Sequence, residues 1–397
     1  MPDLDANAVR THDPGDAGFV DELRGWLADH LVGDFAKHKG VGGIADDSYW
    51  ELRLEWERLL ARHRWLNISW PLEYGGRGGT VQQELLFHIE HARAEAPYWV
   101  GSQGRDLLGP TLLQFGSDAQ RARFLPAITA AEEFWGQGFS EPGAGSDLAG
   151  LATRAEADGD AWVINGEKIW MTFGDHADWL YVLCRTDPAA PRHRGISMLL
   201  VPRHQDGVEV RPITNIAGGR EFCEVFFTDA RTARELVVGE VNGGWKVVMA
   251  TLGNERGWST VLPFLASFRR QVRQLVEYAR QVGADQDPVL RARIIKAWED
   301  FRVLQLHSDR LLGAVLSGRH PGPESSLTKL FWATWHRDLG ELVMDVMGRD
   351  GLVWHDPSDL AGEQQRIFLN SRAETIYGGT VEIQRNIIAE RVLGLPR

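Results

Sequence analysis

Residues 136 to 147 read Gly136-Gln137-Gly138-Phe139-Ser140-Glu141-Pro142-Gly143-Ala144-Gly145-Ser146-Asp147. Pro142, Gly143 and Gly145 oppose regular structure and let the backbone approach a ligand closely. Ser140 and Ser146 add hydroxyl groups on either side of these residues. The stretch suits a ligand that has a flat ring and many hydrogen-bonding groups. A solvent-exposed glycine and proline turn is the alternative.

The sequence before this stretch is helical in character. Apolar residues recur at helical spacing, for example Phe19, Leu23 and Leu27. We expect a loose leader over 1–18. Helices are expected over 19–31, 49–63, 80–95, 110–114 and 118–124, the last ending near Pro126.

The sequence after the stretch predicts a compact β region that extends to about Val238. Short apolar runs alternate with turn pairs, and Asn165-Gly166 between two such runs indicates a hairpin. Further strands are expected over 180–183, 196–201 and 224–227, and helices over 246–280, 288–317, 325–347 and 374–392. These changes in character predict three domains, at 1–133, 134–240 and 241–397.

Composition argues against several classes of protein. The formal charge of −12 disfavours a general nucleic-acid or acidic-membrane binder. No apolar run reaches membrane-spanning length and the N-terminus lacks an apolar signal core, so we expect no integral membrane segment and a cytoplasmic location. Cys184 and Cys223 form neither a disulfide framework nor a metal motif. His88 and His91 stand at helical spacing, but packing is a simpler interpretation than a metal site, and none is expected.

Three segments resemble signatures of the acyl-CoA dehydrogenase family, in the family's order. The first is the stretch quoted above. The others are Asn165-Gly166-Glu167-Lys168-Ile169-Trp170-Met171-Thr172 and Ile376-Tyr377-Gly378-Gly379-Thr380-Val381-Glu382-Ile383-Gln384-Arg385. The resemblance covers nearly the whole chain. It implies an α+β fold with an N-terminal α-helical domain, a middle β-barrel or sandwich domain and a C-terminal four-helix bundle. It also implies FAD as cofactor and an acyl-CoA substrate.

The reaction that the family performs draws attention to residue 378. In that family a carboxylate removes the α-proton of an acyl-CoA while the β-hydrogen leaves as hydride to the flavin. A backbone N–H in a Tyr-Glu-Gly-Thr segment stabilises the enolate-like carbonyl. This chain has Gly378 in place of that glutamate, so the usual base is absent although the N–H remains.

A minority of the family carries the base on the first long C-terminal helix, just before an arginine. The resemblance therefore implies Glu255 as the base and Arg256 as a contact on the CoA side of the site. An ordinary solvated helix pair is the alternative. The moved base and the volume left by Gly378 favour a branched, cyclic or otherwise bulky acyl group.

The ligand contacts also follow from the resemblance. Ser140 would bond the flavin near N5 and Trp170 would pack against its ring. The expected cofactor residues are Gln137, Phe139, Ser140, Gly145, Ser146, Trp170, Met171, Thr172, Thr380 and Glu382. The expected substrate contacts are Ser146, Arg256 and Gly379.

Two segments that family members lend to a neighbouring subunit's flavin depart from the family pattern. Tyr278-Ala279-Arg280-Gln281-Val282-Gly283 lacks the family's Phe-Gly, and Asp345-Val346-Met347-Gly348-Arg349 replaces Gln-x-x-Gly-Gly. Drift, with Arg349 pairing with an FAD phosphate, is one explanation. The other is a heteromer in which a related subunit completes the site. A homotetramer or a heterotetramer is therefore expected.

The resulting hypothesis is an FAD-dependent acyl-CoA dehydrogenase that passes electrons to an electron-transfer flavoprotein. One alternative is an oxidase-like enzyme that oxygen reoxidises. The other is a non-catalytic subunit that completes a partner's site.

Overall fold

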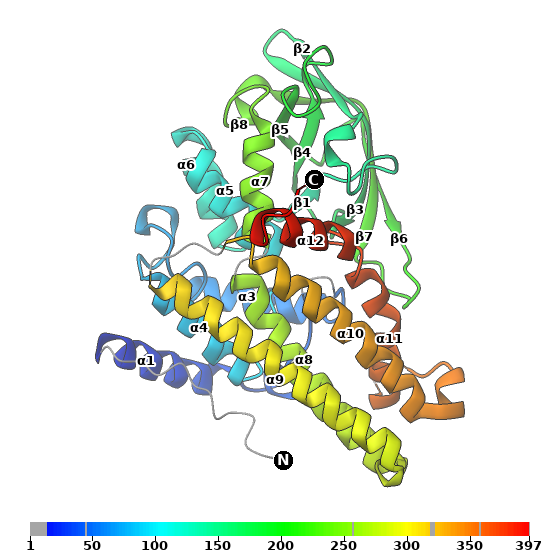
Figure 1. Ribbon diagram of the computed structural model, residues 1–397. Coiled ribbons are helices and arrows are strands. Elements are labelled where there is room, and N and C mark those ends of the chain that lie inside the picture. The colour runs from blue at the N-terminus through cyan, green and yellow to red at the C-terminus, as the bar shows by residue number, and fades with distance from the viewer. Residues whose placement is uncertain (1–13, 44–45, 256–257, 318–321, 357–358, 397) are drawn as a thin grey trace. The chain divides into compact units, whose positions relative to one another are not determined.

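The computed structural model describes residues 14–43, 46–255, 258–317, 322–356 and 359–396 (Figure 1). The chain divides into two compact units. The sheet unit comprises Met1–Phe139, Ala152–Arg211 and Cys223–Thr251, and the helical unit comprises Ser140–Leu151, Pro212–Phe222 and Leu252–Arg397. Among the described helices, none has the length and apolarity needed to cross a membrane.

The first part of the sheet unit is helical, as the sequence predicts. Its helices pack around a buried aromatic cluster that includes Trp56, Trp65 and Phe87. A π-helix over Gln103–Leu108 precedes α5. The helices are α1 (Pro14–His30), α2 (Asp34–Lys37), α3 (Trp50–Arg62), α4 (Val81–Arg93), α5 (Gly109–Phe115) and α6 (Asp118–Thr129). Helix α1 thus begins inside the stretch expected to be a loose leader.

Helix α6 continues past Pro126, so the predicted end near that residue is wrong. A proline inside a helix costs about 3 kcal/mol. The buried side chains of Phe124, Leu125 and Ile128 offset that cost, because each large apolar side chain contributes about 1.5–3 kcal/mol. A capping box between Ser117 and Gln120 also fixes the helix start.

An eight-stranded sheet forms the rest of the sheet unit, with the order β6-β7-β3-β2-β4-β5-β8. Strand β1 lies off this path and pairs with β4 in parallel. Buried apolar side chains such as Leu180, Val182 and Leu199 form the core. The strands are β1 (Trp135–Gly138), β2 (Arg154–Asp158), β3 (Ala161–Thr172), β4 (Trp179–Arg185), β5 (Ile196–Pro202), β6 (Val208–Ile213), β7 (Phe222–Ala233) and β8 (Val237–Val238).

The hairpin predicted at Asn165-Gly166 is wrong, because β3 runs straight through these residues. The turn lies earlier, where Asp158 pairs with Ala161 and Gly159 has a φ of +60°. A Cβ at Gly166 would lie 2.5 Å from the Thr153 hydroxyl oxygen. The glycine therefore allows a close approach of neighbouring backbone within a strand.

The helical unit contains long helices that lie alongside one another (Figure 1). Phe268, Phe301 and Leu339 belong to the buried core between them. Its helices are α8 (Trp258–Gln281), α9 (Pro288–Leu316), α10 (Ser325–Met347), α11 (Leu360–Glu374) and α12 (Val381–Ile387), followed by a π-turn over Ile388–Val392. Helix α7 (Gly244–Glu255) leads into this unit along the chain. The single helix expected over 246–280 is thus described as α7 and α8, on either side of residues 256–257.

The helix expected over 374–392 is also wrong. Helix α11, which the sequence did not reveal, ends at Glu374, and α12 begins only at Val381. Between them Gly378 and Gly379 have φ values of +62° and +91°, which no α-helix accommodates. The chain therefore makes a turn where the third family segment lies.

Candidate functional site

In the sheet unit, strand β1 and strand β3 carry five of the predicted cofactor residues. Met171 is fully buried, and a Cβ at Gly136 would lie 2.6 Å from its sulfur. The glycine in β1 is thus what admits the Met171 side chain. Any contact between Met171 and a cofactor would come from its backbone, whereas Thr172, the last residue of β3, is half-buried.

Trp170 differs from its neighbours in both backbone and exposure. Its φ is +62°, and 56% of the residue is exposed to solvent. A bulky residue in the left-handed region costs roughly 1–3 kcal/mol. Exposure of an indole gives no compensating burial. An aromatic face held in this way fits a flat ligand ring.

The end of β1 carries polar groups suited to a ligand. The side-chain nitrogen of Gln137 is buried and has no hydrogen-bond partner among the described residues. The ammonium group of Lys168, which is fully buried, donates to the carbonyl oxygen of Phe139 at 3.1 Å. The Phe139 ring meets Tyr181 edge to face, at 5.6 Å between centroids. An orphaned buried donor beside a fixed strand end fits a cofactor rich in acceptors, as FAD is.

Lys168 is a candidate functional residue that sequence reasoning missed. It lies within the second family segment, between Glu167 and Ile169. Its partner is a main-chain carbonyl on a strand 29 positions earlier in the chain. A lysine in an alternating strand reads as exposed, so only the fold reveals that this one is buried.

In the helical unit, the loop Ser140–Leu151 makes a tight turn. Glu141 and Ala144 exchange two main-chain hydrogen bonds of 3.0 Å each. A Cβ at Gly143 or Gly145 would meet no atom within 4 Å. Protein packing therefore does not require these glycines, and the open backbone fits close approach by a ligand. Ser140 is half-buried and Ser146 is exposed.

The turn before α12 places the other predicted residues. The hydroxyl of Thr380 accepts a hydrogen bond from the N–H of Ile383 at 3.2 Å and so caps α12. A hydrogen bond from its own backbone N–H, and then one from Thr380, lowers the pKa of Glu382. A carboxylate at a helix start is electrostatically favoured, so Glu382 stays ionised.

The amide of Gln384 reaches back under this turn. Its nitrogen donates to the carbonyl oxygen of Gly378 at 3.0 Å. Gln384 is only 1% exposed. This residue stands within the third family segment, yet the sequence gives no sign that it contacts a main-chain group six positions earlier.

The predicted base lies at the limit of the described structure. Glu255 is the last residue of α7, its side chain is outside the described part, and Arg256 lies outside the described residues. One turn before Glu255, the hydroxyl oxygens of Thr251 and Thr111 lie 2.9 Å apart, and both residues are fully buried. Helix α7 is therefore anchored close to the predicted base.

The two segments that depart from the family pattern bond within their own chain. Asp345 pairs with Arg293 at 2.7 Å, and the Tyr278 hydroxyl donates to the Asp350 carboxylate at 3.1 Å. Gly348 has a φ of +58°, and Arg349 follows it in a 3-10 turn over Gly348–Leu352. The residues that differ from the family thus satisfy one another locally.

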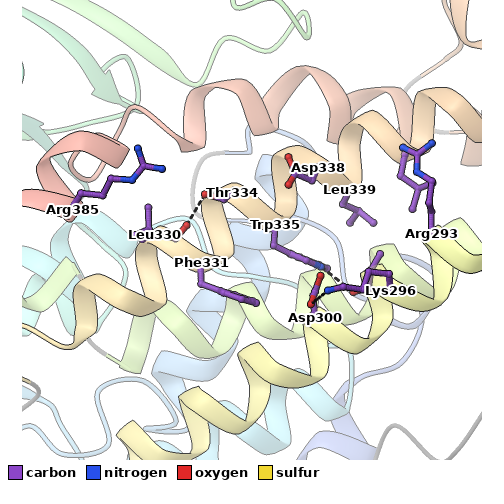
Figure 2. A pocket seen from close by; sticks show the side chains of 12 residues that line it. Arg293, Lys296, Asp300, Leu330, Phe331, Thr334, Trp335, Asp338, Leu339 and Arg385 are labelled. Carbon is purple, nitrogen blue, oxygen red and sulfur yellow. Dashed lines mark hydrogen bonds and ion pairs between the residues drawn. The ribbon is translucent and has the colours of Figure 1, made fainter. Parts of the chain in front are cut away.

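A pocket of about 470 Å³ lies between α9 and α10, with Arg385 of α12 at one end (Figure 2). Phe331, Trp335 and Leu339 supply apolar walls, and Arg293 and Lys296 supply positive charge. None of the residues predicted to bind cofactor or substrate lines it. Arg293 also pairs with Asp345, so the pocket adjoins a segment that departs from the family pattern.

Comparison with protein families matches nearly the whole chain. Residues 18–132 match the acyl-CoA dehydrogenase N-terminal domain, 136–230 the middle domain and 242–393 the C-terminal domain. Acyl-CoA dehydrogenase IpdE1 of Mycobacterium tuberculosis is 49% identical over 383 residues, which are 96% of this chain and 97% of that protein.

Two solved structures are similar over almost their full length. The Tcur3481-Tcur3483 steroid ACAD has a TM-score of 0.83 and 29% identity, covering 98% of this chain and 100% of that chain. The ChsE4-ChsE5 complex from Mycobacterium tuberculosis has a TM-score of 0.80 and 29% identity, with the same coverage of 98% and 100%.

Proposed function

Because the chain belongs to the acyl-CoA dehydrogenase family of FAD-dependent oxidoreductases, we propose that it dehydrogenates a bulky acyl-CoA with Glu255 as the base. The product is the trans-2-enoyl-CoA. Gly378 is the observation that carries the proposal, because it stands in the Tyr-x-Gly-Thr segment and has no side chain that could accept a proton.

The chain's own residues divide the chemical work. An α-proton beside a thioester is weakly acidic, so its removal requires a positioned base and stabilisation of charge on the carbonyl oxygen. Glu255 takes the α-proton onto its carboxylate, and the N–H of Gly378 donates to the thioester carbonyl. FAD, when bound, accepts the β-hydrogen with its electron pair as a hydride.

Residues from both units would hold the cofactor. In the sheet unit, the orphaned amide of Gln137 and the exposed indole of Trp170 support this assignment. In the helical unit, the open backbone at Gly145 and the capping hydroxyl of Thr380 support it. Substrate contacts are assigned to Ser146, Arg256 and Gly379 by resemblance to the family.

A ring-bearing, steroid-like acyl group is the substrate class we favour. Two relatives of known structure, 30% and 29% identical to this chain, are described as a steroid ACAD. Glycine at residue 378 also leaves volume beside the reacting carbons, which a wide acyl group needs.

A related subunit as partner is the second part of the proposal. The relative ChsE4-ChsE5 is a complex. In this chain Asp345 is engaged by Arg293 instead of being available to a neighbour's cofactor. The pocket of Figure 2 presents Phe331 and Trp335 next to that pair, and aromatic residues are enriched at interfaces. The partner would supply the half-site that Asp345 and Arg349 no longer provide.

An electron-transfer flavoprotein in the cytoplasm is the proposed electron acceptor. The alternative acceptor is oxygen. Rapid oxygen consumption during turnover with an acyl-CoA, without any added flavoprotein, would favour the oxidase-like alternative.

Anaerobic bleaching of the flavin absorbance tests the reaction. A panel of acyl-CoAs from straight-chain to steroid-like is mixed with wild type, with Glu255→Gln and with Glu277→Gln, an exposed glutamate of α8 as matched control. We expect the bulky substrates to bleach wild type and the control, and Glu255→Gln to bleach about 10²- to 10⁴-fold more slowly. Bleaching of Glu255→Gln at the wild-type rate would remove Glu255 as the base.

Co-expression with a related subunit tests the partner. The FAD content and mass of the purified protein are measured with and without that subunit. Stoichiometric FAD only in a mixed tetramer would support the heteromer. Full FAD occupancy in a homotetramer would contradict it and would make Arg349 a local adaptation. A complex that holds no FAD would support the non-catalytic alternative.

A further inference from the structure

The turn that carries Gly378 is shaped by side chains that the reaction itself does not use. It begins after Glu374, where α11 ends, and it finishes at Thr380, which caps α12. Gly378 and Gly379 both have positive φ, and glycine adopts such values without a steric penalty. Two consecutive glycines are also the least constrained backbone, so the direction of their peptide groups depends on the surroundings.

Gln384 constrains the turn on the α12 side. Its side-chain nitrogen lies 3.0 Å from the carbonyl oxygen of Gly378 and 3.5 Å from that of Gly379. Since both neighbours are acceptors, the atom that faces them must be the donor nitrogen of the amide. A Cβ at residue 379 would lie 2.5 Å from this nitrogen. Glycine at residue 379 therefore leaves the room in which Gln384 sits.

Lys329 constrains the turn on the α11 side. Its ammonium group donates to the main-chain carbonyl oxygen of Glu374 and lies 5.4 Å from the ring centroid of Tyr377. Lys329 is only 6% exposed. A buried ammonium group is costly unless it is fully engaged, so its contacts with the ends of this segment are strongly preferred.

A buried network supports this second constraint. The Glu374 carboxylate lies 2.6 Å from Nδ1 of His336, and Nε2 of His336 lies 2.7 Å from the Gln271 side-chain oxygen. Glu374 is 6% exposed and His336 is 3% exposed. The last residue of α11 is thereby held through its side chain as well as its carbonyl.

We propose that Gln384 and Lys329 are positioning residues that fix the peptide groups of Gly378, so that its N–H meets the thioester carbonyl. The proposal rests on the proposed function, in which that N–H is the donor. Residue 378 can offer only its backbone, and a misplacement of about 1 Å in such a site costs about 100-fold in rate. The loss of the usual glutamate side chain thus makes the orientation of the turn the main contribution of this segment.

The variant Gln384→Met tests the proposal, because methionine has a similar length and no donor. Gln364→Met is the matched control, since Gln364 is fully buried in α11 and its amide has no hydrogen-bond partner among the described residues. In the FAD-bound enzyme without substrate, Gln384→Met should raise deuterium uptake over 375–381, and Gln364→Met should not. With the acyl-CoA that bleaches wild type fastest, kcat of Gln384→Met should fall roughly 10- to 100-fold, with KM within about threefold.

Two further variants separate positioning from general stability. In Gln384→Glu a carboxylate would face two carbonyl oxygens, and only the protonated acid can donate to Gly378. Its rate relative to Gln384→Met, measured in the same buffers, should rise as the pH falls. Lys329→Met should also increase exchange over 375–381, and Lys329→Arg should restore part of the loss.

The outcomes distinguish this proposal from the proposed function. If wild type dehydrogenates an acyl-CoA while Gln384→Met matches it in both kcat and deuterium uptake, the positioning role is wrong. If no acyl-CoA bleaches wild type, the proposed function fails. The exchange of 375–381 then decides alone whether Gln384 fixes the turn.

Discussion

Trp170 combines two properties that folding by itself does not favour. A left-handed backbone is unfavourable for a bulky residue, and an exposed indole gains little from burial. Strain of this kind persists where the surrounding structure imposes it, and it gathers at ligand sites. The family resemblance assigns a flavin contact to this residue, and the local geometry is of the kind such a contact requires.

His91 predicts how the N-terminal helices respond to acid. Its Nε2 accepts a hydrogen bond from the Trp56 indole N–H at 3.0 Å, which requires an unprotonated nitrogen. Burial, and then the charge of Arg105, lower the pKa of His91 to about 3. Because the folded value lies below the unfolded value of about 6.5, the stabilisation is complete above pH 6.5 and is lost as the pH falls toward 3.

The variant His91→Gln keeps an acceptor for Trp56 and cannot titrate. Between pH 6.5 and pH 5, we expect its free energy of unfolding to fall less steeply than that of wild type, by up to about 1.4 kcal/mol per pH unit. Urea unfolding followed by tryptophan fluorescence measures this slope. The exposed His204 supplies the control His204→Gln. Identical slopes for wild type and His91→Gln would contradict the assignment.

At single residues, the sequence revealed identity better than role. Gly378 could be recognised as a departure because its position in a family segment is fixed by neighbouring letters. Lys168 and Gln384 stand in the same segments, yet their partners are main-chain carbonyls of Phe139 and Gly378. Main-chain partners leave no trace in residue type, so these roles emerge only from the fold.

Among the elements, strand β3 shows why a strong turn signal can mislead. Asn-Gly is common in hairpins because both residues tolerate positive φ. Here Gly166 is needed for a different reason, namely the approach of Thr153. Asn165 meanwhile exchanges hydrogen bonds with Asp229, at 2.9 Å to its carboxylate and 3.0 Å from its N–H. Local preference was correct, but the tertiary contact that used it was not visible.

Gly166→Ala tests this explanation against Gly159→Ala in the preceding turn. Alanine at residue 159 would be strained only by the backbone, because no atom lies within 4 Å of its Cβ. We expect Gly159→Ala to cost about 1 kcal/mol in the free energy of unfolding. Gly166→Ala should cost roughly 1–3 kcal/mol more, because its Cβ would also overlap Thr153. Equal losses in urea unfolding would show that the close approach is unimportant.

Helix boundaries failed where tertiary contacts override local rules. Pro126 should end α6, but the buried face formed by Phe124 and Ile128 carries the helix onward. The sequence around 374–392 has a helical pattern throughout, yet the turn at Gly378 and Gly379 interrupts it. Both errors come from weighing a residue's preference without the packing that surrounds it.

At the scale of the whole molecule, the predictions from sequence were more reliable. The acyl-CoA dehydrogenase family, its three-part fold, the FAD cofactor and the oxidoreductase class are confirmed. These depend on long stretches of pattern, which tolerate local errors. The residue boundaries of the three domains, the roles of the site residues and the cytoplasmic location stay predictions.

The composition of the two units predicts the behaviour of a fragment. Ser140–Leu151 and Pro212–Phe222 belong by contact to the unit that contains Leu252–Arg397. A fragment of residues 1–251 would lack the helices against which both segments pack. In limited proteolysis with a non-specific protease, we expect early cleavage within 140–151 and 212–222 in the fragment and protection in the full chain. Strands β4 and β5, whose partners are present in the fragment, are the internal control.

The same division has a consequence for the order of events at the ribosome. The segment Ser140–Leu151, which would touch the flavin, is synthesised long before any helix of Leu252–Arg397 exists. Domains tend to form in the order in which they leave the ribosome. The sheet unit can therefore assemble during translation, while this segment must wait for the C-terminal helices to be made. Acquisition of cofactor would then be a late, post-translational step, timed by the last part of the chain to emerge.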